Sequence, residues 1–134
     1  LAPDEGGKTT VADSLPDGHV LSDDNLILRK ENGTMMVHST PFGQLGNGPS
    51  KGELHGIFLL EKSSQFGISP LSSNQLFSHL WEERPFLRST IPPNMRKKYF
   101  DLLYQICHSA PIYKMKFEKD DIKWDEISSL LERQ

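Results

Sequence analysis

Turn-rich segments divide the chain into short elements, and their pattern of hydrophobic and polar positions favours strands early and helices late. The short apolar runs at residues 19–21 and 26–28 favour strands, and the Asn-Gly pair at 32–33 is typical of a tight turn, so we expect a hairpin over residues 25–39. The continuous apolar run over residues 54–60 predicts a buried strand that is covered on both faces. Residues 112–117 alternate apolar and basic side chains, which predicts an edge or half-exposed strand.

Four segments have features of helices. Residues 8–15 predict a short helix that ends at Pro16-Asp17-Gly18, and Ser72 or Ser73 can cap a helix that runs to about Glu83 and stops before Pro85. Residues 92–94 open an amphipathic helix over residues 95–109 that Pro111 closes, and residues 120–133 form a last helix. The predicted apolar face of the helix that ends near Glu83 consists of Leu76, Phe77 and Leu80. That of the helix over residues 95–109 consists of Met95, Tyr99, Leu102, Leu103 and Ile106, and that of the last helix consists of Trp124, Ile127, Leu130 and Leu131. This pattern predicts a mixed α/β domain.

Residues 40–52 are rich in helix- and strand-breaking residues. The segment contains four glycines and two prolines, so we expect no regular structure there. Loops of this length in a small domain are often functional or disordered.

Composition limits the classes of function. The chain has 134 residues with 36% hydrophobic and 25% charged, which suits one domain over residues 1–134. The net charge of -3 disfavours a nucleic-acid partner, and no apolar stretch approaches the roughly 20 residues that cross a membrane. No basic and apolar leader opens the chain, and Cys107 has no second cysteine with which to pair, so we expect a soluble protein in the cytoplasm.

The chemistry is most concentrated at residues 2–9, APDEGGKT. This octet fits the phosphate-binding loop G-x-x-x-x-G-K-[ST] at every fixed position except the first, which is Ala2. Backbone N–H groups of such a loop surround phosphates, the lysine ammonium contacts the terminal ones and the hydroxyl binds Mg²⁺. Lys8 and Thr9 would have these two roles, with Gly6, Gly7 and Thr10 completing the nucleotide contacts. The alternative interpretation is a glycine-rich turn that caps a helix.

An acidic pair follows shortly after this loop. Asp23 and Asp24 end a short apolar segment, and Mg²⁺ is commonly bound by one or two carboxylates together with substrate phosphates. A second carboxylate could accept the proton of an attacking hydroxyl. The alternative is a solvated turn in which the aspartates cap local N–H groups.

These residues together carry a family resemblance. The order APDEGGKTT, LSDDNLILR, a hairpin that ends in Thr-Pro-Phe-Gly, and then ELHGIFLL resembles the nucleotide-binding core of the HPr kinase/phosphorylase family. It is most similar to the small bacterial HPr-kinase-related proteins, which have the phosphoenolpyruvate carboxykinase-like P-loop fold, a mixed sheet with flanking helices. The resemblance covers residues 1–62 as the nucleotide-binding core and, more loosely, residues 63–134 as a helical carboxyl-terminal part.

The resemblance implies a Mg²⁺-dependent ATP-binding protein. Lys8 would contact the phosphates, Thr9 and Asp23 would bind the metal, and Asp24 would be a metal ligand or the catalytic base, although which aspartate has which role is open. The reaction would transfer the γ-phosphoryl group to a serine of a protein or peptide, and the family implies a homo-oligomer. A P-loop unit also needs a strand that feeds the loop, so we expect either a fragment of a longer chain or a strand supplied differently.

Departures from the family pattern leave two other functions open. Ala2 and Glu5 replace glycines of the family loop, and His55 stands where the family strand has an arginine. A relative that keeps the fold as a non-catalytic binding module is therefore one alternative, and a small-molecule kinase is another. His55 is either a weak phosphate-directed group or a half-buried strand histidine that a neighbour satisfies.

The remaining candidates are interpreted structurally. The run at residues 96–98, Arg-Lys-Lys, is typical of a solvated helical turn, and the five histidines have no metal-binding spacing. Cys107 lies near the apolar stripe of its helix and is expected to be a buried, inert thiol. The aromatic residues at helical spacing, Trp81, Tyr99, Phe100, Tyr104 and Trp124, indicate a core or a lid.

Overall fold

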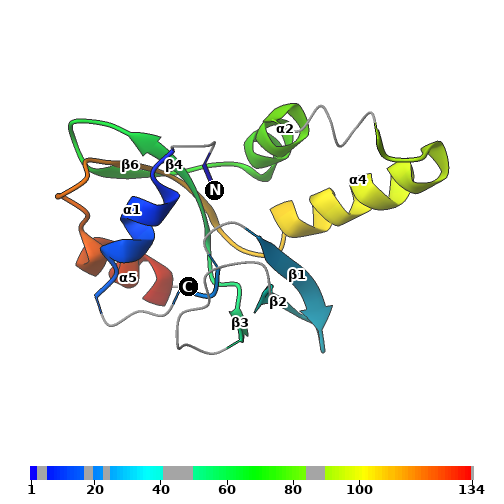
Figure 1. Cartoon of the computed structure of the whole chain (residues 1–134), viewed down its shortest axis with the longest axis horizontal. Helices are drawn as coiled ribbons and strands as arrows, with labels where there is room; N and C mark the ends of the chain where they lie inside the picture. Colours follow the sequence, from blue (N-terminus) through cyan, green and yellow to red (C-terminus); the bar gives the residue numbers. More distant parts are fainter. Residues whose placement is uncertain (3–5, 17–19, 23–24, 41–49, 84–89, 134) are drawn as a thin grey trace.

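The chain folds as a mixed α/β protein. The structure is a computed structural model of the 134 residues, and it describes residues 1–2, 6–16, 20–22, 25–40, 50–83 and 90–133. The elements in chain order are α1 (Lys8–Asp13), β1 (Leu26–Glu31), β2 (Thr34–Ser39), β3 (Lys51–Glu53), β4 (Ile57–Lys62), β5 (Gly67–Pro70), α2 (Ser73–Glu83), α4 (Pro93–Cys107), β6 (Ile112–Phe117) and α5 (Trp124–Glu132), as Figure 1 shows. Within these ranges the strands form two sheets, which we call sheet A (β1–β2–β3) and sheet B (β4–β6–β5).

Sheet A is built on the hairpin that the Asn-Gly pair predicts. β1 and β2 pair antiparallel along their whole length. Asn32 and Gly33 have φ values of 50° and 94°, as the mirror-image turns of two-residue hairpins require. The predicted hairpin is therefore confirmed.

Two other expectations for this half of the chain are wrong. Residues 51–53 form β3 and pair with β2, although the sequence predicts no regular structure up to Gly52, because an open strand edge can bind backbone whatever its side chains. Val20 and Leu21 lie in no strand, since a short apolar run becomes a strand only where another strand pairs with it. Residue 19 and residues 41–49 lie outside the described residues.

A carboxylate links the three strands of sheet A. Glu31 of β1 contacts His38 Nε2 of β2 at 2.9 Å and accepts a hydrogen bond from Lys51 Nζ of β3 at 3.1 Å. The hydrogen bond from Lys51 is the main cause that lowers the pKa of Glu31, and His38 adds to it. This cluster joins side chains of all three strands of sheet A.

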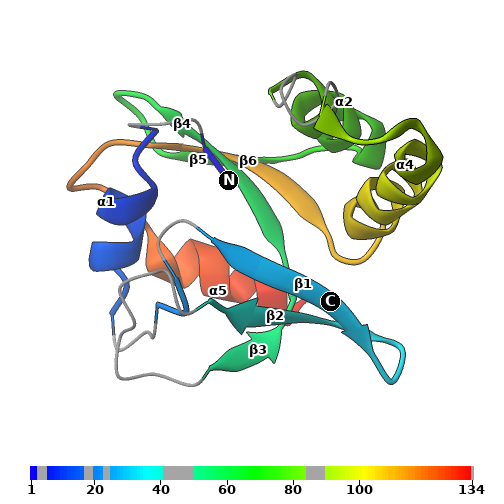
Figure 2. The same cartoon turned by 45° about the vertical axis from the view of Figure 1, so that its right-hand side comes forward.

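Sheet B has a helical layer on each face. β4 and β6 are parallel, and β5 is antiparallel to β6. On one face Ile57 and Ile112 pack with Leu76 of α2 and Cys107 of α4, whereas on the other face Met115 and Phe117 pack with Ile127 of α5. Val11 of α1 also packs against the second cluster. Figure 2 shows the two layers, with α1 and α5 on one side of the sheet and α2 and α4 on the other.

The expectation that residues 112–117 form an edge or half-exposed strand is wrong. β6 is the central strand of sheet B, and Ile112, Tyr113, Met115 and Phe117 are buried. Its lysines, Lys114 and Lys116, share one face and both contact the carboxylate of Glu61 on β4. Alternation of apolar and basic residues indicates that the two faces of a strand have different surroundings. It does not indicate whether other strands pair with the strand on both of its edges.

The predicted strand is confirmed for residues 57–60 and begins later than expected, but the expectation that it is covered on both faces is wrong, since only Ile57 is buried and residues 58–60 are half-buried. β4 starts at Ile57, while residues 54–56 connect β3 to β4. His55 lies in this connection and is exposed, so the expectation of a half-buried strand histidine is wrong. The sequence also gives no sign of β5, which ends at Pro70; a proline is tolerated there because β5 is an edge strand.

Side-chain capping starts α2 where the sequence predicts it. Ser72 Oγ accepts a hydrogen bond from the backbone N–H of Gln75 at 3.3 Å, and Gln75 Oε1 accepts one from the backbone N–H of Ser72 at 2.9 Å. These reciprocal bonds are a capping box. Leu76 is then fully buried, as its place on the predicted apolar face requires.

The predicted stripe of α4 is buried only in part. Leu103 is buried, and Tyr99 and Ile106 are half-buried. Met95 and Leu102 are 49% and 47% exposed, so this part of the expected core face is wrong. One helix, α2, covers α4 on one side, which is too narrow a contact to bury the whole stripe.

Candidate functional site

The described residues of the octet at 2–9 follow a strand position at Leu1 and continue into a helix. The backbone N of Leu1 donates to the Phe58 carbonyl at 2.6 Å, and the backbone N–H of Leu60 donates to the Leu1 carbonyl at 2.8 Å. These two bonds flank Leu59, which is the pattern of a parallel strand pair. Leu1 therefore lies beside β4, parallel to it, on the edge that β6 does not occupy.

The helix that follows starts at the expected residue. α1 begins at Lys8, and the backbone N–H of Val11 donates to the Gly7 carbonyl at 3.0 Å. The helix is shorter than the predicted 8–15 and ends at Asp13. Residues 1–13 thus follow the order strand position, connecting segment and helix, although residues 3–5 of the connection lie outside the described residues.

Two independent features of the structure disfavour any residue other than glycine at position 7. The φ of Gly7 is 91°, a left-handed conformation that residues with a Cβ rarely adopt. A Cβ on Gly7 would also overlap the ring of Phe117, which is 2% exposed in the core of sheet B. The end of the loop therefore lies directly on the central strand, and only glycine fits there.

The side chain of Lys8 reaches back to the start of the segment that connects Leu1 with α1. Lys8 Nζ donates to the Ala2 carbonyl at 3.0 Å, so the ammonium lies next to the first residue of the octet. Lys8 is half-buried, as are Gly6 and Thr10, whereas Thr9 is exposed. A cation, two glycines and two hydroxyl-bearing residues are thus brought together at the start of α1.

Contacts with α5 fix the position of α1. Ser14 Oγ donates to the Val11 carbonyl at 2.8 Å and accepts from Trp124 Nε1 at 3.3 Å. Val11 packs into the cluster that contains Phe117 and Ile127. Sequence reasoning did not find these supports, because Phe117 and Trp124 are distant in sequence and each has the appearance of an ordinary core residue.

The acidic pair is the part of the predicted site that cannot be placed. Asp23 and Asp24 lie outside the described residues, so their roles at a metal stay predictions. The neighbouring Ser22 has a buried Oγ with no hydrogen-bond partner among the described residues. The same part of the chain contains no cluster of three or more histidine, cysteine, aspartate or glutamate side chains that could hold a metal ion.

The single cysteine is buried as expected. Cys107 is fully buried between α4, α2 and sheet B, and burial raises the pKa of its thiol. A raised pKa disfavours the reactive thiolate. The basic residues 96–98 are exposed on α4, which agrees with a solvated helical turn.

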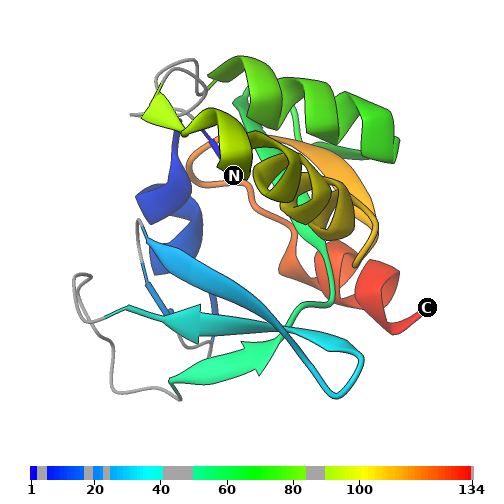
Figure 3. The ribbon, with the colours of Figure 1, turned by 90° about the vertical axis from the view of Figure 1, so that its right-hand side faces the viewer.

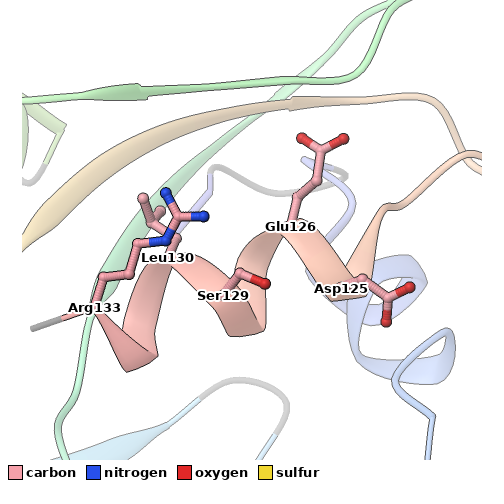
Figure 4. Close-up of a pocket in the computed structure, with 5 residues that line it drawn as sticks. All are labelled: Asp125, Glu126, Ser129, Leu130 and Arg133. Atoms are coloured by element: carbon pink, nitrogen blue, oxygen red, sulfur yellow. The ribbon is translucent and has the colours of Figure 1, made fainter.

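Two surface hollows lie away from the loop. One, of about 380 Å³, is lined along α5 by Asp125, Glu126, Ser129, Leu130 and Arg133. Figure 4 shows that Glu126 and Arg133 point to one side of the helix while Asp125 points away from them, so its charged groups do not converge. The other, of about 450 Å³, lies between sheet A and the end of α4.

Comparison with known proteins gives no family assignment, since no protein family, characterised protein or solved structure matches the chain. In the described residues no helix is long and apolar enough to cross a membrane.

Proposed function

We propose that this chain is an HPr kinase-like protein with a phosphoenolpyruvate carboxykinase-like P-loop fold, which binds ATP and Mg²⁺ and transfers a phosphoryl group to a serine of a protein or peptide. The observation that carries the proposal is the hydrogen bond from Lys8 Nζ to the Ala2 carbonyl. This bond spans the segment that connects Leu1, which lies parallel to β4, with the helix that begins at Lys8. This order of elements and this place for the lysine are what a phosphate loop needs.

The residues at the start of α1 fit the proposed ligand chemically. Gly7 brings the backbone close to the core without a side chain in the way, and Lys8 offers an ammonium that can exchange a carbonyl for phosphate oxygens. The exposed hydroxyl of Thr9 is available as a metal ligand. In the proposal Asp23 completes the metal site, and Asp24 either binds the metal or accepts the proton of the serine hydroxyl. ATP would supply the phosphoryl group, and Mg²⁺ would neutralise part of its charge.

A calorimetric titration of the protein with ATP, with and without Mg²⁺, tests the proposal. We expect micromolar binding that depends on the metal. Absence of binding in both conditions would contradict the proposal. It would favour the second candidate, a non-catalytic binding module, which Ala2 and Glu5 support because they replace glycines of the family loop.

The metal dependence should be lost in Asp23→Asn. The amide keeps the size of the side chain but removes the charge that would bind Mg²⁺, so we expect about tenfold weaker binding of ATP with the metal and little change without it. Calorimetry under both conditions measures the two affinities. The matched control is Asp120→Asn, an exposed turn residue that should alter neither. Equal losses with and without Mg²⁺ would exclude the metal role of Asp23.

A further inference from the structure

One face of sheet A presents a row of three side chains toward α4. Lys30 of β1 lies directly opposite Met35 of β2, and the backbone N–H of Leu54, next to the end of β3, donates to the Met35 carbonyl at 2.9 Å. Residues opposite one another in antiparallel strands direct their side chains to the same face. Leu54 packs against the core cluster that contains Cys107 of α4 and Ile112 of β6. This face of sheet A therefore turns toward α4.

A hollow of about 450 Å³ lies between this row and the last turn of α4. Lys30, Met35 and Leu54 line it on the side of sheet A, and Tyr104 and His108 line it on the side of α4. Figure 3 shows α4 above sheet A in the view. Met35 and Leu54 are half-buried, so the floor of the hollow is apolar. Pockets for small molecules have about this volume and this mixture of apolar floor and few polar groups.

The wall on α4 is an aromatic pair with a fixed imidazole. The rings of Tyr104 and His108 stack with centroids 4.1 Å apart and 26° between their planes. His108 Nδ1 lies 2.8 Å from the Tyr104 carbonyl, and a carbonyl only accepts hydrogen bonds, so Nδ1 carries the hydrogen. In the neutral imidazole Nε2 is then an acceptor. The wall thus offers aromatic surface and one acceptor of defined tautomer.

The charge that sheet A presents to the hollow is positive. Lys30 is exposed and makes no ion pair with another described residue. Glu53 also lines the hollow, but it lies opposite Met36 in the register of β2 and β3. Because successive residues of a strand alternate between its faces, the Glu53 side chain leaves the sheet on the face opposite to that of Leu54. An anionic ligand group in the hollow would therefore be attracted to Lys30.

We propose that this hollow binds a small aromatic carboxylate with a hydroxyl group on its ring. The carboxylate would accept charge-assisted hydrogen bonds from Lys30 Nζ, and the ring would lie on the apolar floor against Tyr104 and His108. The hydroxyl would donate to His108 Nε2. The site lies away from the candidate phosphate loop, so the proposal goes beyond nucleotide binding and does not depend on it.

Titration with para-hydroxybenzoate, followed by the amide NMR signals of the protein, tests the site. We expect the signals of Met35, Leu54 and His108 to shift, while those of α5 stay unchanged. Para-hydroxybenzamide has the same shape without the charge and should bind about tenfold more weakly. Para-methoxybenzoate keeps the charge but has no hydrogen to donate, so it should bind about fivefold more weakly.

Variants assign each probe group to a side chain. Lys30→Ala should weaken binding of para-hydroxybenzoate by about tenfold and remove its advantage over the benzamide. The matched control is Arg29→Ala, which makes the same change of charge on the neighbouring residue, on the opposite face of β1. Its affinity should stay within about twofold of the parent protein. His108→Phe keeps a ring on the wall but removes Nε2, so the hydroxy and methoxy probes should bind it equally.

Three results would overturn the proposal. Absence of shifts at the residues that line the hollow would show that the probe does not bind there. Equal affinities of the parent protein for para-hydroxybenzoate and para-hydroxybenzamide would show that Lys30 does not contact the ligand. Equal losses in Lys30→Ala and Arg29→Ala would assign the effect to the net charge of the protein and not to the hollow.

Discussion

Replacing Lys8 by alanine is expected to weaken ATP·Mg²⁺ binding by about 100-fold while leaving the fold intact. The ammonium is the group that would make charge-assisted hydrogen bonds to the phosphates, and each such bond contributes about 1.5–3 kcal/mol. Lys8 belongs to neither hydrophobic core cluster, so its loss should cost the core little. Calorimetry measures the affinity, and thermal unfolding should shift by no more than about 3 °C.

The matched control for this substitution is Lys62→Ala. Lys62 is exposed at the end of β4, so this variant makes the same change of charge on the strand that pairs with Leu1. Its affinity for ATP should stay within about twofold of the parent protein, because a surface charge change at this position removes no proposed contact. An unchanged affinity in Lys8→Ala would remove the phosphate-loop assignment, since no other described residue of the octet offers a cation.

The sequence predicts the hairpin turn and the starts of α2 and α1, because residues close together in the sequence determine each of them. The positive φ values that Asn32 and Gly33 tolerate determine the hairpin, and the Ser72 and Gln75 side chains determine the start of α2. The helix predicted from residue 8 begins there as α1. Each of these features depends on residues within a few positions of one another, so a single segment of sequence contains the whole cause.

The sequence does not indicate which strands pair with one another or which distant residues come into contact. β6 is central because β4 and β5 pair with its two edges, and nothing within residues 112–117 indicates those partners. The approach of Phe117 to Gly7 is a second example, since it links the candidate loop to the middle of sheet B. The candidate site could thus be predicted as a set of residues in the loop, while its support from Phe117 and Trp124 required the structure.

Gly7→Ala is expected to destabilise the protein by about 2–5 kcal/mol. A left-handed φ costs a residue with a Cβ about 1–2 kcal/mol, and forcing a methyl group against a packed core residue costs about 1–3 kcal/mol more. The overlap cannot be relieved cheaply, because Phe117 is 2% exposed and packs with Met115 and Ile127. Urea unfolding followed by circular dichroism measures the free energy of unfolding.

Gly33→Ala is the control that separates the two costs. Gly33 also has a positive φ, 94°, but a Cβ there would meet nothing within 4 Å. This variant should therefore lose only the conformational part, about 1–2 kcal/mol. The difference between the two variants reports the contact between Gly7 and Phe117.

A double-mutant cycle assigns that difference to the ring itself. Phe117→Leu shortens the side chain that a Cβ at residue 7 would overlap, so adding Gly7→Ala to it should cost less than adding Gly7→Ala to the parent protein, by at least about 1 kcal/mol. Equal costs in the two backgrounds, or equal losses for Gly7→Ala and Gly33→Ala, would show that the loop does not lie on the central strand. In that case the position of Lys8 would be set by α1 alone, through the contacts of Val11 and Ser14, and not by the end of the loop.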